Sequence, residues 1–147
     1  MRRRGVKRPV LADVRTFRAP PASFDAAVLY GCNLGLAGTA LGLEVLLARL
    51  AALVRPGGLL VGTQVEVLQT DRPAHLDFHA RNRALGREAG ETWLRVERDD
   101  RRGPWFPWFL VGSEEVSAAA ERAGFAVERV LHAPSGPLYA LVARRRS

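Results

Sequence analysis

The sequence predicts an α/β domain whose sheet is mostly parallel and is closed by antiparallel strands. The apolar segment from Phe24 to Tyr30 runs directly into a glycine-rich loop, which is typical of a strand covered on both faces that ends at a ligand site. A leucine-rich helix then leads through Pro-Gly-Gly into a second apolar strand. Two further apolar segments follow Gly124 and have the length of closing strands.

The chain is predicted to start on the end of a helix, because Arg2 to Lys7 is rich in arginine and Gly5 can adopt the left-handed conformation that stops a helix. Val10 to Val14 is predicted as a short strand parallel to the one at Phe24 to Tyr30. The segment between them contains Pro20 and Pro21 and is predicted as a loop.

The loop after Tyr30 contains Gly31, Gly35 and Gly38, with Asn33 among them. These glycines let the backbone turn sharply and expose its N–H groups beyond the strand, where ligands bind in open α/β sheets. The 18 uncharged residues from 26 to 43 also have the length of a membrane span. Their four glycines and one asparagine argue against insertion.

One right-handed βαβ unit is predicted next. Thr39 is the expected helix cap, and the residues that follow repeat at the spacing of one buried helix face: Leu43, Leu46, Leu47, Leu50 and Val54. Pro56 ends this helix, Gly57 and Gly58 form the turn, and Leu59 to Val67 is the next strand.

The second half is predicted to contain a helix over 73–87, an antiparallel hairpin and a helix capped by Ser113. The hairpin strands are 92–98 and 105–111, with the turn at 99–103. The buried face of the last helix consists of Val116, Ala119, Ala120 and Ala123, and Gly124 ends it. Antiparallel strands over 125–131 and 138–143 complete the sheet.

Composition indicates one globular domain of 147 residues, 48% of them hydrophobic and 25% charged. Eight of the 22 basic residues lie in the first eight and last four positions. We expect these ends to be solvated, and the near-neutral remainder argues against a nucleic-acid partner. Cys32 is the single cysteine, so no intrachain disulfide forms. Asp13 and Arg15 interrupt any signal-peptide core, so we expect a cytoplasmic protein without a membrane partner.

Four segments carry a family resemblance: ADV at 12–14, FDAAVLYGCNLGLAG at 24–38, LLARLAALVRPGGLLVGT at 46–63 and GPWFPWFL at 103–110. In this order they resemble the carboxyl-terminal two-thirds of a class I S-adenosylmethionine-dependent methyltransferase. The resemblance implies a Rossmann-like sheet and S-adenosylmethionine as the cofactor. It also implies that residues 1–147 form a single partial methyltransferase domain with a helix-hairpin insertion at about 73–111.

The family's G-x-G-x-G loop after the first strand, and the ribose-binding acid after the second, have no counterpart in the chain. The resemblance therefore implies an N-terminally truncated domain, which by itself would bind the cofactor weakly or not at all. A sheet without its first strand exposes an apolar edge, and this leaves self-association through that edge open.

The resemblance assigns the cofactor to two segments. Asp13 would accept a hydrogen bond from the adenine amino group, and the N–H of Val14 would reach the ring; an ordinary solvated acid at a strand end is the alternative. Gly31 and Asn33 would line the methyl-transfer site, while asparagine among glycines is also a common turn residue. Cys32 is expected to be a small apolar filler.

His75 and His79 share a helix face at i, i+4 spacing. A metal site would need a glutamate where Leu76 stands and a third ligand, so no metal is expected. His79 is a candidate general base, and an exposed polar helix face is the alternative that the sequence favours.

The hairpin carries four aromatic residues within 105–109. In the family such a hairpin covers the acceptor, so Trp105, Phe106 and Trp108 are candidates to stack on a planar or cationic molecule. Alternatively, these side chains pack against the sheet. We expect one face of the hairpin to be buried in this way and the other to be available to the acceptor.

The resemblance implies methyl transfer to an unidentified acceptor, expected to be a small molecule. A non-catalytic remnant or interaction module with the same fold is the alternative. Nucleic-acid binding through the basic ends is a third class, which strongly salt-dependent affinity would reveal.

Overall fold

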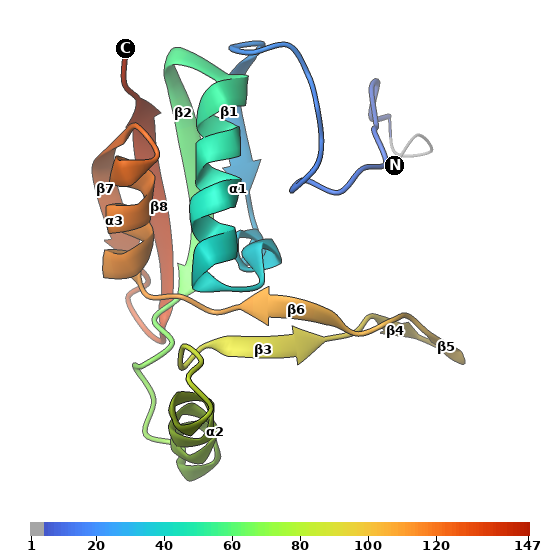
Figure 1. The fold of residues 1–147 in the computed structure, drawn as a ribbon, viewed down its shortest axis with the longest axis vertical. Helices are drawn as coiled ribbons and strands as arrows, with labels where there is room; N and C mark the ends of the chain where they lie inside the picture. Colours follow the sequence, from blue (N-terminus) through green and yellow to red (C-terminus); the bar gives the residue numbers. More distant parts are fainter. Residues whose placement is uncertain (1–4) are drawn as a thin grey trace.

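The computed structural model describes residues 5–147 and contains one central sheet with two helices on one face (Figure 1). The strands lie in the order β1 (Phe24–Leu29), β2 (Val54–Val65), β8 (Leu138–Arg145) and β7 (Phe125–His132). β1 and β2 are parallel, whereas β8 is antiparallel to both of its neighbours. The closing antiparallel strands are confirmed, but the described sheet is mixed rather than mostly parallel.

The βαβ unit forms as predicted around helix α1 (Ala40–Leu53). The Thr39 side chain accepts a hydrogen bond from the N–H of Gly42 at 3.0 Å and caps the helix. The leucine face is buried, with Leu46 and Leu47 fully inaccessible. The helix ends at Leu53, and β2 begins at Val54 rather than at Leu59.

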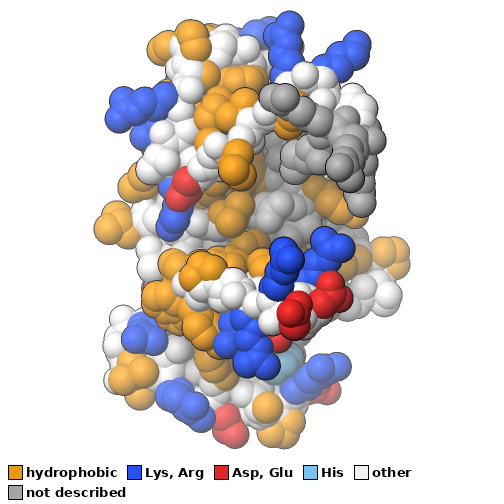
Figure 2. Space-filling model, turned by 90° about the vertical axis from the view of Figure 1, so that its right-hand side faces the viewer, with side chains coloured by type: hydrophobic (Ala, Val, Ile, Leu, Met, Phe, Trp, Pro, Cys, Tyr) orange, Lys and Arg blue, Asp and Glu red, His pale blue; other side chains and the backbone are white. Residues whose placement is uncertain are grey.

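Strand β1 lies at the edge of the sheet, and the expectation that both of its faces are covered is wrong. Leu29 faces the core and is 6% exposed, whereas Val28 on the opposite face is 67% exposed. α1 and α3 (Ser113–Arg122) cover only the Leu29 face. The other face presents Val28, Val61 and Val142 side by side across three strands, and Figure 2 shows hydrophobic side chains on the side of the molecule that carries β1.

The predicted strand at Val10 to Val14 is absent. The carbonyl oxygen of Asp13 accepts hydrogen bonds from the N–H groups of Thr16 and Phe17, which folds the chain into a turn. Within residues 5–147 no strand pairs with this segment, and without a partner for its backbone groups an extended apolar segment is not held in place. Leu11 is accordingly fully exposed.

The predicted helix end at Arg2 to Lys7 lies partly outside the described residues. Gly5 has φ 78°, in the left-handed region as predicted, and residues 5–8 are not helical. At the other end of the chain the arginines are less solvated than expected. Arg145 donates to the carbonyl oxygens of Ala51 and Gly124, each at 3.0 Å, and so joins helix α1 and the residue before β7 to β8.

Between β2 and α3 the chain forms a separate layer at the foot of the sheet (Figure 1). It contains α2 (Pro73–Ala84) and the antiparallel pair β3 (Glu91–Leu94) and β6 (Phe106–Phe109). The short strands β4 (Glu97–Arg98) and β5 (Arg101–Arg102) form the tip of the predicted hairpin, where basic and acidic side chains lie together.

Helix α3 begins at Ser113, the residue that was predicted to cap it, because Gly112 is the capping residue. The Glu66 carboxylate accepts hydrogen bonds from the N–H of Ser113 at 3.2 and 3.3 Å and satisfies the first turn. Gly124, with φ 93°, ends this segment as predicted. Among the described residues, no helix is long and apolar enough to cross a membrane.

Candidate functional site

The loop after β1 lies at the carboxyl ends of the two parallel strands, where the sequence predicts a ligand. Gly31 (φ 70°) and Cys32 (φ 62°) are both left-handed and turn the chain into the short 3-10 helix η2 (Asn33–Ala37). The Thr63 hydroxyl accepts hydrogen bonds from the N–H of Gly31 at 2.9 Å and of Cys32 at 3.4 Å. Thr63 therefore fixes the loop from the neighbouring strand, a role that the sequence did not single out.

An open hollow of about 500 Å³ lies against this loop. Tyr30, Gly31, Cys32 and Thr63 form one side, and residues of β7 and β8, among them Leu131 and Leu138, form the other. No heavy atom lies within 4 Å of the position that a Cβ on Gly31 would occupy. The loop backbone is thus open to a ligand on this side of the sheet.

Asn33 starts η2 and is exposed. Within residues 5–147 its side chain makes no hydrogen bond, so it does not form the local turn bond that is common for asparagine. Cys32 is half-buried, and burial raises the pKa of its thiol. A protonated thiol agrees with the predicted role of a filler.

Asp13 and Val14 do not line this hollow. The Asp13 carboxylate accepts hydrogen bonds from the Arg15 side chain at 2.7 to 3.1 Å and from its backbone N–H at 2.9 Å. These bonds lower the pKa of Asp13. Val14 is half-buried and packs against the hydrophobic core. The structure does not bring the two predicted cofactor segments together around one cavity.

The aromatic hairpin divides its side chains between packing and exposure. The Trp108 indole lies against Gly35, so closely that a Cβ there would overlap it, and the Phe106 ring is 6.0 Å from the Trp108 ring in an edge-on arrangement. Trp105 is 58% exposed, with the Arg95 guanidinium 4.8 Å from its ring centroid. Phe109 is buried in the core.

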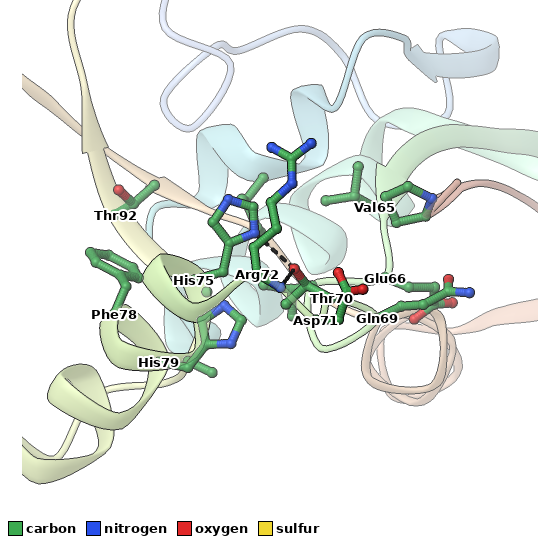
Figure 3. A pocket seen from close by; sticks show the side chains of 15 residues that line it. Val65, Glu66, Gln69, Thr70, Asp71, Arg72, His75, Phe78, His79 and Thr92 are labelled. Carbon is green, nitrogen blue, oxygen red and sulfur yellow. Dashed lines mark hydrogen bonds between the residues drawn. The ribbon is translucent and has the colours of Figure 1, made fainter. Parts of the chain in front are cut away.

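A second hollow, which we call the α2 cavity, has a volume of about 600 Å³ and lies between α2, the end of β2 and β3 (Figure 3). It was not predicted. Its walls include apolar side chains from all sides, and its polar groups come mostly from the chain that leads into α2: Glu66, Gln69, Thr70, Asp71, Arg72, His75 and His79.

The two histidines of α2 have different surroundings, and the favoured expectation of an exposed polar face is wrong for His79. His75 is exposed, and its Nδ1 lies 2.9 Å from the Thr70 hydroxyl. His79 is only 6% exposed. Burial, followed by the charges of Arg83 and His75, lowers the pKa of His79.

Two buried amides position these hollows and were missed by the sequence reasoning. The Asn82 side chain donates to the carbonyl oxygens of Glu88, Ala89 and Glu91 at 2.7 to 3.2 Å, which holds the start of β3 to α2. Gln64, fully buried in β2, donates to the carbonyl oxygen of Phe109 at 3.2 Å. The signal for Asn82 was present: residues 79 and 82 share a helix face, and α2 has no strong apolar face that would be buried instead.

Among residues 5–147, no three histidine, cysteine or acidic side chains gather in a way that would hold a metal ion.

No model of a known protein family matches the sequence, and no curated protein matches it. Solved structures do match. A S-adenosylmethionine-dependent methyltransferase from Bacteroides fragilis, in complex with S-adenosyl-L-homocysteine, is similar over 100% of this chain and 58% of its own, with 21% identity and a TM-score of 0.75. One from Methanosarcina mazei is similar over 90% of this chain and 64% of its own, with 15% identity and a TM-score of 0.67.

An amino pentose methyltransferase from Micromonospora echinaspora, with S-adenosylmethionine bound, is similar over 91% of this chain and 63% of its own, with 19% identity and a TM-score of 0.53. The chain thus spans about three-fifths of the length of these structures. It has the class I S-adenosylmethionine-dependent methyltransferase fold, as the resemblance implied.

Proposed function

We propose that these residues are part of an enzyme that transfers a methyl group from S-adenosylmethionine to a small-molecule acceptor. The observation that carries the proposal is the open loop at the carboxyl end of β1, in a fold shared with S-adenosylmethionine-dependent methyltransferases. The match to a methyltransferase of an amino pentose supports a small molecule as the acceptor.

The hollow beside the loop fits part of this cofactor. Its volume is within the range of small-molecule sites, and the space beside Gly31 admits a ligand close to the backbone. The N–H groups of Gly31 and Cys32 are already bonded to Thr63, so they are not free to bind the carboxylate of the cofactor's methionine part. Gly31 and Asn33 would line the methyl-transfer site, as the resemblance implied. Asp13 and Val14 would reach the adenine only after the segment before β1 moves, because Asp13 is paired with Arg15 and does not line the hollow.

S-adenosylmethionine supplies a methyl group on a sulfonium sulfur, and that sulfur becomes a neutral thioether on transfer. The protein then has to align the acceptor, exclude water and accept a proton where the acceptor carries one. Trp105 is an exposed aromatic ring of the hairpin, and we propose that it stacks on the acceptor together with Phe106 and Trp108, whose rings contact each other.

The proposed enzyme needs a glycine-rich loop for the methionine part, and the 147 residues contain no G-x-G-x-G sequence. We therefore propose that they form a partial domain in which residues 73–111 are an insertion. The second candidate, an interaction module without catalysis, is favoured by the outer edge of β1, because no strand within residues 5–147 pairs with it.

The coding DNA immediately before the Met1 codon separates the two candidates. An in-frame segment that encodes a glycine-rich strand, loop and helix supports the enzyme. A polypeptide that includes the segment should then bind S-adenosylhomocysteine with a micromolar dissociation constant in calorimetry, whereas residues 1–147 alone should not. An in-frame stop codon without such a segment, or micromolar binding by residues 1–147 alone, contradicts this account.

A further inference from the structure

The α2 cavity combines apolar walls with one buried imidazole. Side chains that line it include Val67, Phe78 and Leu110, which come from three different parts of the chain. Figure 3 shows His75 and His79 projecting from α2 on the same side, toward the segment that carries Thr70 and Asp71. A cavity of about 600 Å³ has the size of sites that enclose molecules with one or a few rings.

His79 is the polar group that the cavity buries most deeply, since 94% of the residue is inaccessible. Within residues 5–147 its ring makes no hydrogen bond, in contrast to the ring of His75. Although the residue as a whole is buried, its ring nitrogens are not among the fully buried atoms that lack a partner within residues 5–147, so they are accessible from the cavity. An accessible ring nitrogen without a protein partner, in a cavity with several apolar walls, is suited to a hydrogen bond from a ligand.

Burial and nearby positive charges favour the neutral form of this imidazole. Burial is the largest cause of its lowered pKa, followed by the charges of Arg83 and His75 on α2 itself. Asp71 and Arg72, of opposite charge, line the cavity from the segment before α2. Glu66, at the end of β2, is committed to the first turn of α3. A neutral imidazole has one nitrogen that accepts a hydrogen bond.

We propose that the α2 cavity binds an apolar, ring-containing molecule that carries a hydroxyl group, and that the hydroxyl donates its hydrogen bond to the free ring nitrogen of His79. Phenols and naphthols belong to this class. The binding itself does not depend on the proposed function.

1-Naphthol and 1-methoxynaphthalene are a matched pair of probes, because only the first has a hydroxyl proton to donate. Calorimetry on the 147-residue chain, without cofactor, should give an affinity for 1-naphthol that is about 3- to 10-fold higher, the usual contribution of one hydrogen bond. His79→Leu should abolish this difference, and His132→Leu, outside the cavity, should keep it. Equal affinities for the two probes would overturn the proposal.

Two alanines provide a control for the location. Ala89 lines the cavity and Ala84 does not, so Ala89→Phe should abolish binding of 1-naphthol and Ala84→Phe should leave it unchanged. If His79→Leu fails to fold, the ring nitrogens of wild-type His79 should shift in NMR spectra on addition of 1-naphthol, and those of His132 should stay in place. Unchanged His79 signals at saturation contradict the proposal.

The same measurements separate this proposal from the proposed function. Binding of 1-naphthol by a protein that never binds S-adenosylhomocysteine, even with the upstream segment, leaves the cavity assignment intact and removes the methyltransferase. Binding of S-adenosylhomocysteine, together with equal affinities for 1-naphthol and 1-methoxynaphthalene, supports the methyltransferase and contradicts the cavity assignment.

Discussion

The side chain of Gln64 donates a hydrogen bond to the carbonyl oxygen of Phe109 at 3.2 Å in the interior of the protein. Gln64 belongs to the central sheet and Phe109 to the aromatic hairpin, so one amide joins the two layers. The Gln64 carbonyl also accepts from the N–H of Val65 at 3.0 Å. Gln64 also donates to the carbonyl oxygen of Cys32 at 3.4 Å, so the same buried amide contacts both the hairpin and the loop after β1.

Gln64→Leu should lower the free energy of unfolding by about 1–3 kcal/mol, because it leaves the Phe109 carbonyl oxygen buried without a partner. Urea unfolding measures this change. Gln69→Leu is the matched control, since Gln69 is exposed and its replacement should change the value by less than about 0.5 kcal/mol. Equal effects of the two substitutions contradict the assigned role of Gln64.

Gly35→Ala should displace the hairpin, because its new Cβ would overlap the Trp108 indole. We expect a loss of about 1–3 kcal/mol in the free energy of unfolding, as for other overpacked sites, together with a change in tryptophan fluorescence. A double-mutant cycle with Trp108→Ala isolates the contact. The cost of Gly35→Ala should mostly vanish in the Trp108→Ala protein, and an undiminished cost would show that the strain lies elsewhere.

The His79 ring should titrate at a lower pH than an ordinary histidine side chain in NMR spectra, because burial and nearby positive charges lower its pKa. The unfolded chain then takes up its proton at a higher pH than the folded protein does. The contribution of His79 to stability is complete above the unfolded pKa of about 6.5 and is lost as the pH falls toward the folded pKa. His79→Gln should weaken this pH dependence of unfolding, and an unchanged pH dependence in the His79→Gln protein would contradict the assignment.

Asp13→Ala should change the free energy of unfolding of the 147-residue chain by less than about 1 kcal/mol, because its partner Arg15 and the carboxylate are both substantially exposed. In a polypeptide that binds the cofactor, the same substitution should weaken affinity for S-adenosylhomocysteine by roughly 10- to 100-fold, the effect of losing a charged hydrogen bond. Asp13→Asn should cost less, because its amide oxygen still accepts. If Asp13→Ala instead unfolds the protein while the folded fraction keeps its affinity for S-adenosylhomocysteine, Asp13 is a structural cap and not an adenine ligand.

Local patterns in the sequence were sufficient for most of the fold. The leucines of α1 and the Thr39 cap depend on neighbours within a few residues, and such short-range rules held. The turn predicted at Gly57 and Gly58 did not form, because both residues lie within β2. The prediction of a strand at Val10 to Val14 was wrong because a strand needs a neighbouring strand to bond its backbone, and none within residues 5–147 lies beside this segment. The exposure of β1 has the same cause: its apolar sequence does not reveal what lies along its edge.

The α2 cavity could not be derived from local patterns. It is formed by segments that are distant in sequence, such as Val67, His79 and Leu110. The weak apolar face of α2 was interpreted as solvent exposure, whereas the structure buries His79 and Asn82 on that face. Polar residues at helical spacing become a buried face when backbone carbonyls lie opposite them, as those of Glu88 and Ala89 do for Asn82.

The most direct test of the central claim, that the carboxyl end of β1 binds the cofactor, is an NMR titration of the ¹⁵N-labelled 147-residue chain with S-adenosylhomocysteine. Amide shift changes remain measurable for weak binding. We predict a dissociation constant of about 1 mM or weaker, with the largest changes at the backbone amides of Gly31, Cys32 and Asn33. Unchanged signals at these three residues when the ligand is in large excess, or changes confined to the hairpin and α2, would contradict the claim.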